Sequence, residues 1–462
     1  MPGRGSSVHR RARRGPSAGS LAWRTLVLSG LVVRAGWVVL SIIAHGRGFP
    51  PRSRARLEAR EASFARAYVG VAMRFRGGLI KLGQMASLRV DVMPEAITNE
   101  LVRLQDRVEP HSFDEVEAQL EDELGPGWSR RFSSFERAPI AAASLGQVHA
   151  ARARDGEKLA VKVLYPGIER SVAADLRMAR LALWLFNFFV KAELNQIYRE
   201  IQESIQGEMD YLREGRAAEE IARNLATDAE LWSHLRIPGI RWDTTTRRVL
   251  TMEFIEGVKI NDYAASQGAD KSVDELVRWI SRAFLHMIFR DGFFHCDPHP
   301  GNLLVDSTGR IGIIDFGMNK RMSPAVLAAV RENVRATVQR DPDRYADSLI
   351  EAGIVRARDR QPVIELARLS FDSRYYNLNP KELASLDFAQ YFREVRDQMR
   401  QIGGFQLPDG LVSWSRAFSL LYVLGAELAP GLRPLDVVGP YVLEFLLGGG
   451  AGSGLTDGPG TV

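Results

Sequence analysis

The chain has 462 residues, of which 45% are hydrophobic and 25% charged, a composition that is ordinary for a globular protein and long enough for two or three domains. Its one cysteine, Cys296, excludes a disulfide within the chain. The net charge of +5 is unevenly spread, because the first 60 residues hold twelve arginines and one acidic residue, a local balance of +11 that leaves −6 for the remainder. A basic segment on a mildly acidic body favours an anionic partner, and we expect a membrane surface rather than nucleic acid.

The first predicted element is a strongly apolar helix at residues 21–45. Arg24 and Arg34 interrupt it, and an arginine at the middle of a spanning helix costs roughly 2.5–3.5 kcal/mol on insertion scales. We therefore expect this helix to lie at a membrane interface, which suits Trp23 and Trp37, or to pack on the body of the protein, rather than to cross a bilayer. A signal peptide is disfavoured, since no clear small-residue cleavage site follows the apolar stretch.

Helical periodicity continues from residue 57 to about 125, with apolar residues spaced by three and four. Pro94 is expected to start or bound a helix, and Pro110 to mark a boundary. Short runs of strand-forming residues follow, and a long helical stretch is expected between the last two of them. The runs cover 145–152, 158–164 and 248–254, and the helical stretch covers 171–226.

Helices are expected to dominate after residue 272, apart from a hairpin whose two arms, 303–305 and 311–314, flank a Ser-Thr-Gly turn. These changes of pattern predict five parts. They are a basic tail with the apolar helix at 1–46, a helical extension at 47–130, a strand-containing lobe with a helical insert at 131–257, a helical lobe at 258–446 and a flexible Gly-rich tail at 447–462.

Residues 140–148 align with the Gly-x-Gly-x-x-Gly-x-Val loop that covers nucleotide phosphates in kinases. Ala141 and Ala143 replace the first two glycines, whereas Gly146 and Val148 keep their places. Glycines let backbone N–H groups approach phosphates, and alanine narrows the conformations available to the backbone. Taken alone, the run fits an ordinary surface turn. As a nucleotide-binding loop it would use Ile140, Ala141, Ala142, Ala143, Ser144, Gly146 and Val148.

Lys162 interrupts the apolar run Leu-Ala-Val-Lys-Val at 159–163, the kind of strand that presents a lysine to the α- and β-phosphates. A lysine at an inward strand position needs a partner, because a buried unpaired charge is costly. Glu214, on a predicted helix, is the preferred partner, and Glu208 and Asp210 are further candidates. For any one of these acids, a solvated helix face is the alternative.

Residues 252–257, Met-Glu-Phe-Ile-Glu-Gly, end a predicted strand and enter a turn. In a two-lobed kinase this position is the linker whose backbone hydrogen-bonds adenine, which would make Glu253 and Ile255 nucleotide-contacting residues. The residues by themselves indicate only a strand followed by a glycine turn.

The strongest signal is Phe-His-Cys-Asp-Pro-His-Pro-Gly-Asn at 294–302, followed by Ile-Asp-Phe-Gly at 314–317. Kinase catalytic loops carry an Asn five residues beyond their Asp, and a later Asp-Phe-Gly supplies a second metal ligand. Asp297 and Asn302 have that spacing, and Asp315 opens the Asp-Phe-Gly. The sequence therefore predicts ATP or ADP bound with Mg²⁺ between two lobes, with Asn302 and Asp315 as metal ligands. Asp297 would accept the proton of an acceptor hydroxyl or orient a water.

His295, Asp297 and His299 could instead suggest a zinc site, although no further His or Cys cluster lies nearby in the sequence. Cys296 stands where kinases usually carry Arg, and we interpret it as a buried structural thiol.

Four motifs in order resemble the ABC1/UbiB/ADCK (AarF) family of atypical protein-kinase-like proteins over roughly residues 60–345. They are the Lys-x-Gly-Gln motif within 79–84, the Ala-rich loop at 141–147, the Glu-x-Asp motif at 208–210 and the catalytic loop at 297–302, with 104–106 and 165–167 also typical. The resemblance implies an α+β, bilobal protein-kinase-like fold, with an N-terminal helical extension packed over the active site.

The resemblance also implies roles for individual residues. Lys162 and Glu214 would form the lysine–glutamate ion pair, and Lys81 and Gln84 would lie on the extension that folds over the site where a protein substrate would dock. Glu208 and Asp210 would interact with that extension. An Ala-Pro-Glu motif does not follow Asp-Phe-Gly, and helical sequence begins at about 323, so an ordinary peptide-docking segment is not expected.

We therefore expect a Mg-ATP-dependent atypical kinase or ATPase, and the resemblance implies that it supports ubiquinone or other prenyl-lipid metabolism. Its expected partners are nucleotide, an anionic membrane or prenyl-quinone-like lipid, and biosynthetic enzymes, at the cytoplasmic face of the cell membrane. A nucleotide-binding pseudokinase scaffold is the alternative, and a conventional protein kinase is disfavoured by Ala141 and Ala143.

Overall fold

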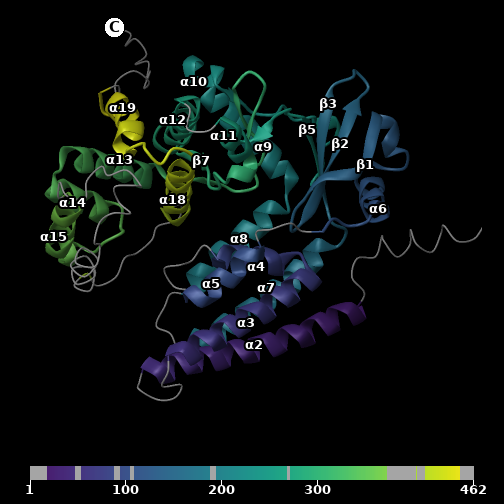
Figure 1. Ribbon diagram of the computed structural model, residues 1–462, viewed down its shortest axis with the longest axis horizontal. Coiled ribbons are helices and arrows are strands. Elements are labelled where there is room, and N and C mark those ends of the chain that lie inside the picture. Colours follow the sequence, from purple (N-terminus) through teal and green to yellow (C-terminus); the bar gives the residue numbers. More distant parts are fainter. Residues whose placement is uncertain are drawn as a thin grey trace, which may run out of the picture. The chain divides into compact units, whose positions relative to one another are not determined.

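The computed structural model describes residues 18–46, 54–87, 94–104, 109–187, 194–267, 271–371, 402 and 411–447. The chain forms two compact units (Figure 1). Unit 1 comprises Met1–Arg216 with Gly239–Phe254, and unit 2 comprises Ala217–Pro238 with Ile255–Val462. The predicted tail segments 1–17 and 448–462 lie outside the described residues, as do Gln105 and Asp106.

Unit 1 combines helices with one four-stranded antiparallel sheet in the order β1-β2-β3-β5. Its helices are α2 (Ala18–Gly46), α3 (Arg54–Phe75), α4 (Gly78–Ser87), α5 (Glu95–Leu101), η1 (Val102–Leu104), α6 (Phe113–Leu124), η2 (Trp128–Arg131), α7 (Ile168–Asn187), α8 (Leu194–Glu208), the start of α9 (Tyr211–Leu225) and η3 (Trp242–Thr244). Its strands are β1 (Phe132–Ala142), β2 (Gly146–Ala153), β3 (Lys158–Leu164) and β5 (Val249–Glu253).

Strands β2, β3 and β5 coincide within two residues with the runs predicted from the sequence. Strand β1 was not predicted. It is an edge strand whose side chains are mostly exposed, so the alternation of buried and exposed residues that marks a half-buried strand is weak there.

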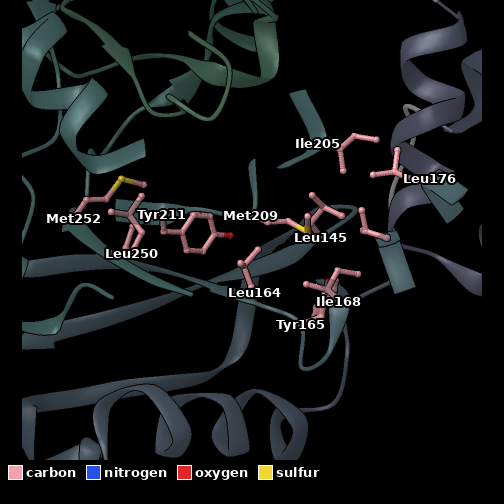
Figure 2. Packing of buried hydrophobic residues seen from close by; sticks show 12 residues of the cluster. Leu145, Leu164, Tyr165, Ile168, Leu176, Ile205, Met209, Tyr211, Leu250 and Met252 are labelled. Atoms are coloured by element: carbon pink, nitrogen blue, oxygen red, sulfur yellow. The ribbon is translucent and has the colours of Figure 1, made fainter. Parts of the chain in front are cut away.

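Successive residues of β3 point to opposite faces of the sheet, and each face has its own core. Leu159, Val161 and Val163 pack with residues of α6 and η2 in one cluster. Ala160 and Leu164 belong to the other cluster, which includes residues of α7, α8 and α9 (Figure 2). Lys162 alternates with Ala160 and Leu164 at every second position and so lies on the same face as they do. The strand therefore directs its side chain toward these helices.

The long helix predicted at 171–226 is interrupted in the structure. Helix α7 ends at Asn187, α8 ends at Glu208 and α9 begins at Tyr211. Asp210 Oδ1 accepts a hydrogen bond from the backbone N–H of Arg213, 3.2 Å away, in the manner of an N-cap. The apolar periodicity runs through this break because Met209 and Tyr211 are buried in the same core, as Figure 2 shows.

Helix α2 packs along α3 and α7 within unit 1 (Figure 1). The segment Ala22–His45 is long and apolar enough to cross a membrane by length and composition. Arg24, however, is buried and forms a double ion pair with Asp175 of α7, with Nε–Oδ1 and Nη2–Oδ2 distances of 2.7 and 2.5 Å. The same guanidinium donates to the carbonyls of Phe75 and Arg76, where α3 ends. Of the two placements predicted for this helix, packing on the protein is therefore present.

Unit 2 is mainly helical, with short strands. Its helices are the remainder of α9, α10 (Ala229–Ser233), α11 (Ile260–Gln267), α12 (Lys271–Leu285), the π-helical η4 (His286–Asp291), η5 (Pro300–Asn302), α13 (Pro324–Gln339), α14 (Pro342–Glu351), η6 (Ala357–Asp359), α15 (Arg360–Ser370), α18 (Leu411–Leu428) and α19 (Pro434–Leu447). Its strands are β4 (Leu235–Arg236), β6 (Val258–Lys259), β7 (Phe293–His295), β8 (Leu303–Val305), β9 (Ile311–Ile313) and β10 (Asn319–Arg321), in sheets ordered β4-β9-β8-β6 and β10-β7.

The hairpin predicted at 303–314 is present as β8 and β9. Asp306 Oδ1 holds its turn by accepting hydrogen bonds from the backbone N–H groups of Thr308 and Arg310, at 2.8 and 3.0 Å. Gly309 has a φ of 82°, a left-handed conformation that favours glycine.

Candidate active-site residues

Lys162 and Glu214 form a buried ion pair in unit 1. The Lys162 Nζ donates to Glu214 Oε1 at 2.6 Å, and the two residues are 9% and 4% exposed. Glu214 lies in the first turn of α9, where the helix dipole favours a negative charge. Removing one partner of such a pair leaves an uncompensated buried charge, which costs about 3–5 kcal/mol. The pairing expected from the sequence is thus present.

The Ala-rich loop is a tight hairpin turn between β1 and β2. Ala141 pairs with Val148 across the two strands, and the backbone N–H of Ala143 donates to the Gly146 carbonyl at 2.8 Å. The N–H of Ala143 is therefore already used inside the turn. The turn is also anchored to the core, because Leu145 is buried and its carbonyl accepts from the Tyr165 N–H at 3.0 Å.

Gly146 is required by close packing at the end of this turn. A Cβ at this position would lie 2.5 Å from the Val163 carbonyl oxygen and 3.0 Å from Tyr211 Oη. Because the first of these atoms is backbone, it cannot move aside as a flexible side chain would. Two residues further along β2, Val148 lies opposite Lys162 of β3. The register of β2 and β3 therefore places the loop's last predicted residue beside the lysine.

The remaining five predicted loop residues differ in burial. Ile140, Ala141 and Ala143 are exposed, and Ser144 is buried. Ala142 is half-buried.

The Lys-x-Gly-Gln motif lies on α4 and contacts the Glu-x-Asp motif at the end of α8. Lys81 forms an ion pair with Glu208, and both side chains are mostly buried. Gln84 Nε2 donates to the Leu104 carbonyl at 2.8 Å. Glu208 therefore contacts the helical extension, as expected, whereas the contacts of Asp210 are with the Arg213 N–H and, at 3.9 Å, with Arg247.

Gly83 within this motif allows close helix packing. A Cβ there would lie 2.2 Å from Leu104 Cδ1 and 2.9 Å from Tyr68 Cε1. Tyr68 in turn donates from Oη to the Leu79 carbonyl at 2.7 Å. The glycine lets α4 approach η1 and α3, so the motif has a packing role beside its ion pair.

Glu253 ends β5 in unit 1, and its backbone N–H donates to the Gly239 carbonyl at 2.8 Å. Its Oε2 accepts a longer hydrogen bond, of 3.4 Å, from the Gly239 N–H. Ile255 is a buried residue of unit 2 whose side chain lies over Gly312 of β9, where a Cβ would be 2.9 Å from Ile255 Cγ2. The predicted linker residues therefore fall one in each unit.

The predicted catalytic loop of unit 2 folds around the backbone of Asp297. The Asp297 carbonyl accepts from the His299 N–H at 2.7 Å and from Asn302 Nδ2 at 3.4 Å. Before it, Cys296 is buried, and its N–H donates to the Met318 carbonyl at 2.9 Å, which joins the loop to the segment after Asp-Phe-Gly. Asp297 is half-buried.

The β8–β9 hairpin brings Asn302 and Asp315 to the same end. Leu303 pairs with Ile313, and the Ile314 N–H donates to the Asn302 carbonyl at 3.1 Å, so the two predicted metal ligands flank the base of the hairpin. Asp315 Oδ1 accepts from the Gly317 N–H at 3.0 Å. Because the amide nitrogen of Asn302 points to Asp297, its side-chain oxygen is the atom that a metal would take.

This donor set fits Mg²⁺. A carboxylate and an amide oxygen are hard ligands, and Mg²⁺ is usually held by one or two carboxylates together with substrate phosphates. The zinc alternative fits less well. His295 is buried with Nδ1 2.9 Å from the Met318 carbonyl, and His299 Nδ1 accepts from the Gly301 N–H. Among the residues that the structure describes, no three His, Cys, Asp or Glu side chains gather as a metal site.

Asp175 is a buried charged residue that sequence reasoning missed. It is 1% exposed, and burial raises the pKa of its carboxyl to about 6, although Arg24 opposes that shift. The sequence pattern that could have identified it is an acidic residue on the apolar face of a helix, between Val172 and Leu176, which are both buried. Its partner is 151 residues away, so no local pattern links the two.

Comparison with known proteins gives a consistent result. A family model described as "ABC1 atypical kinase-like domain" matches residues 103–349. The chain is 30% identical to "Probable protein kinase UbiB" of Pseudomonas fluorescens over 79% of its own length and 69% of the relative's. It is 33% identical to "Protein ACTIVITY OF BC1 COMPLEX KINASE 7, chloroplastic" of Arabidopsis thaliana, over 79% of its own length and 52% of the relative's. It is 32% identical to "Uncharacterized protein sll1770" of Synechocystis, over 79% of its own length and 62% of the relative's.

The first of these curated relatives are longer proteins, of which the chain spans between half and two thirds. A solved structure, that of Rv3197 with erythromycin from Mycobacterium tuberculosis, aligns with a TM-score of 0.50 at 24% identity, covering 77% of this chain and 93% of the other. This likeness concerns the fold. Together with the family match, it confirms the predicted kinase-like fold of mixed helix and sheet.

Proposed function

Because the chain belongs to the ABC1 atypical kinase-like family, we propose that it binds ATP or ADP with Mg²⁺ and catalyses phosphoryl transfer, as an atypical kinase or an ATPase. The observation that carries this proposal is the buried Lys162–Glu214 pair. A lysine held at an inward strand position by a carboxylate is costly to bury for stability alone, and it is the arrangement that presents an ammonium to nucleotide phosphates in kinases.

Each residue then has a defined task. Glu214 holds the Lys162 ammonium in place to contact the α- and β-phosphates. Asn302 and Asp315 supply oxygen ligands, and Asp297 orients the acceptor hydroxyl or water and takes its proton. Mg²⁺, when bound, would neutralise charge on the β- and γ-phosphates.

The nucleotide's remaining contacts are assigned to two segments. The loop at 140–148 would lie on the phosphates, and the backbone of Glu253 and Ile255 would hydrogen-bond adenine. The tight turn at Ala143, whose N–H already donates to Gly146, supports a more restricted loop than a glycine-rich one. It would therefore offer the phosphates fewer N–H donors than a conventional kinase does.

A conventional protein kinase is the less supported reading. The helical extension is fixed by the Lys81–Glu208 pair and by the packing of Gly83. After Gly317 the chain enters β10 and then, at Pro324, helix α13. This short connection does not resemble a peptide-docking activation segment. Water or a small molecule is therefore the proposed acceptor class.

The relatives named UbiB support a role in ubiquinone or other prenyl-lipid metabolism, with a lipid or prenyl quinone and biosynthetic enzymes as partners. The arginine-rich first 60 residues support association with the cytoplasmic face of a cell membrane.

Phosphate release from Mg-ATP by the full chain, with and without anionic vesicles, tests this proposal. Asp315→Asn should abolish release, because an amide is a much weaker Mg²⁺ ligand than a carboxylate, whereas Asp262→Asn, at an exposed site on α11, should not change it. Wild-type turnover in Asp315→Asn would contradict the assignment. Nucleotide binding by the wild type without release under any condition would favour the alternative, a pseudokinase scaffold that organises biosynthetic partners.

A further inference from the structure

Helix α2 has one face inside unit 1 and one apolar face outside. The inner face holds Arg24, Leu28, Leu31 and Val38, which are all buried. The outer face repeats at intervals of three, four and seven residues, and its large side chains are between 44% and 74% exposed: Trp23, Leu26, Val33, Trp37 and Leu40. A helix that is apolar on both sides but packs on one needs a second apolar environment for the other.

The outer face continues into a groove of about 680 Å³ between α2 and α3. Its walls are mostly apolar and include two guanidinium groups: Val33, Arg34, Trp37 and Leu40 of α2, with Arg60 and Phe64 of α3. A groove of this volume is within the range of sites that take small molecules or lipid chains.

The two arginines make the groove suited to an anionic amphiphile. Arg60 is held along the wall, because its Nη1 donates to Ser41 Oγ at 3.0 Å and its guanidinium lies 5.9 Å from the Trp37 ring centroid. Arg34 is exposed on the opposite wall. The surrounding sequence adds charge of the same sign, since residues 1–17 hold five arginines and no acid, and 47–53 hold two more.

A bilayer surface matches this face better than a partner helix does. From Trp23 to Leu40 the exposed stripe spans 18 residues, about 27 Å at 1.5 Å per residue, with a tryptophan near each end. Tryptophan and arginine beside an aliphatic stripe are the composition of helices that lie in the plane of an anionic membrane interface. Crossing the bilayer is opposed by Arg24, which the Asp175 carboxylate and two backbone carbonyls hold inside unit 1.

We propose that the α2–α3 groove binds an anionic phospholipid of a bilayer surface, with an acyl chain along Val33, Trp37, Leu40 and Phe64 and the phosphate at Arg34 and Arg60. The proposal deepens the membrane association in the proposed function, and rests on it for the class of partner. It names the site and the chemistry of the lipid, and it requires no nucleotide.

Vesicle flotation of the full chain tests the site. Wild type should bind phosphatidylcholine vesicles containing phosphatidylglycerol more tightly than pure phosphatidylcholine. Arg34→Gln with Arg60→Gln should weaken binding to the anionic vesicles about 25-fold, since each basic residue near such a surface is worth about 1 kcal/mol, or fivefold. Trp37→Ala with Leu40→Ala should weaken binding to the anionic vesicles roughly tenfold or more, because a large apolar side chain loses its burial.

Matched controls use exposed residues of unit 1 outside the groove. Arg74→Gln on α3 and Trp184→Ala on α7 remove the same chemistry and should change binding less than twofold. Equal binding by wild type and both groove variants, or equal losses in the controls, would overturn the proposal. Inhibition of flotation by inorganic phosphate at millimolar concentration would also overturn it, because it would assign the arginines to a soluble anion.

A label placed in the groove locates the lipid directly. Cys296 is 3% exposed, so a thiol introduced by Val33→Cys can be labelled selectively with an environment-sensitive dye. Brominated acyl chains should quench this label strongly and a label at Met73→Cys, elsewhere on α3, weakly. Equal quenching would refute a groove-bound chain. Asp315→Asn should float like the wild type, so loss of phosphate release and loss of lipid binding remain separate results.

Discussion

Glu214→Gln isolates the energetic role of the buried pair at the candidate site. The substitution keeps the side-chain shape but removes the charge that faces Lys162 at 2.6 Å. With Lys162 only 9% exposed, its ammonium would be left buried and uncompensated on the face of β3 that also holds Ala160 and Leu164. Breaking a buried pair from one side costs about 3–5 kcal/mol, and we expect the free energy of unfolding of unit 1 to fall by that amount.

The double variant Lys162→Met with Glu214→Gln provides the matched control. It removes both charges while keeping similar volume, so it should recover most of the stability that Glu214→Gln loses, with a coupling energy of about 2–3 kcal/mol in the double-mutant cycle. Chemical denaturation followed by circular dichroism, in parallel with nucleotide binding, measures both effects. The reasoning would be refuted by a Glu214→Gln chain within 0.5 kcal/mol of wild type. If the pair positions the Lys162 ammonium on the nucleotide phosphates, both variants should lose nucleotide binding, including the double variant that recovers stability.

Two further predictions concern packing and pH. Gly146→Ala should destabilise unit 1 by about 1–3 kcal/mol, because its Cβ would meet the Val163 carbonyl oxygen at 2.5 Å. Gly239→Ala is the control and should cost much less, because a Cβ there would have no atom within 4 Å. Equal losses of stability for the two variants in chemical denaturation would contradict this packing argument. Burial raises the pKa of Asp175 from 3.8 to about 6, so the native state binds this proton more tightly than the unfolded chain. The stability that this proton contributes is therefore fully present below about pH 4 and is lost as the pH rises through 6, by up to about 3 kcal/mol. The test compares the free energies of unfolding of the wild type and Asp175→Asn. A difference between them that stays constant over this pH range would exclude the contribution.

The sequence was most informative where function and local pattern coincide. Lys162 breaks an apolar strand of period two, which is enough to place its side chain on the face of Ala160 and Leu164. The spacing of Asn302 and Asp315 around one hairpin likewise predicts that they lie at a common end, which the β8–β9 register confirms. The kinase-like fold follows from these motifs in their order, and the family match confirms it.

Features without a clear local pattern, and contacts between residues distant in the sequence, could not be predicted in this way. Strand β1 is an exposed edge, so its residues lack the alternation that marks a half-buried strand. The break between α8 and α9 is marked by a cap at Asp210 that lies inside a periodic apolar pattern. The Arg24–Asp175 pair joins two residues 151 positions apart, and together with the buried Leu28 and Leu31 it holds α2 on the protein. The α2–α3 groove depends on that packing, so the sequence alone could not predict it.

A single-turnover assay with Mg-ATP tests the central claim most directly, because it detects phosphoryl transfer whatever the acceptor. The full chain in excess over labelled Mg-ATP should convert it to ADP, and omitting Mg²⁺ or substituting Asp315→Asn should stop the conversion while Asp262→Asn leaves it intact. Conversion that continues in Asp315→Asn, or bound ATP that stays unconverted in the wild type with anionic vesicles present, would contradict the assignment of this chain as a phosphoryl-transfer enzyme.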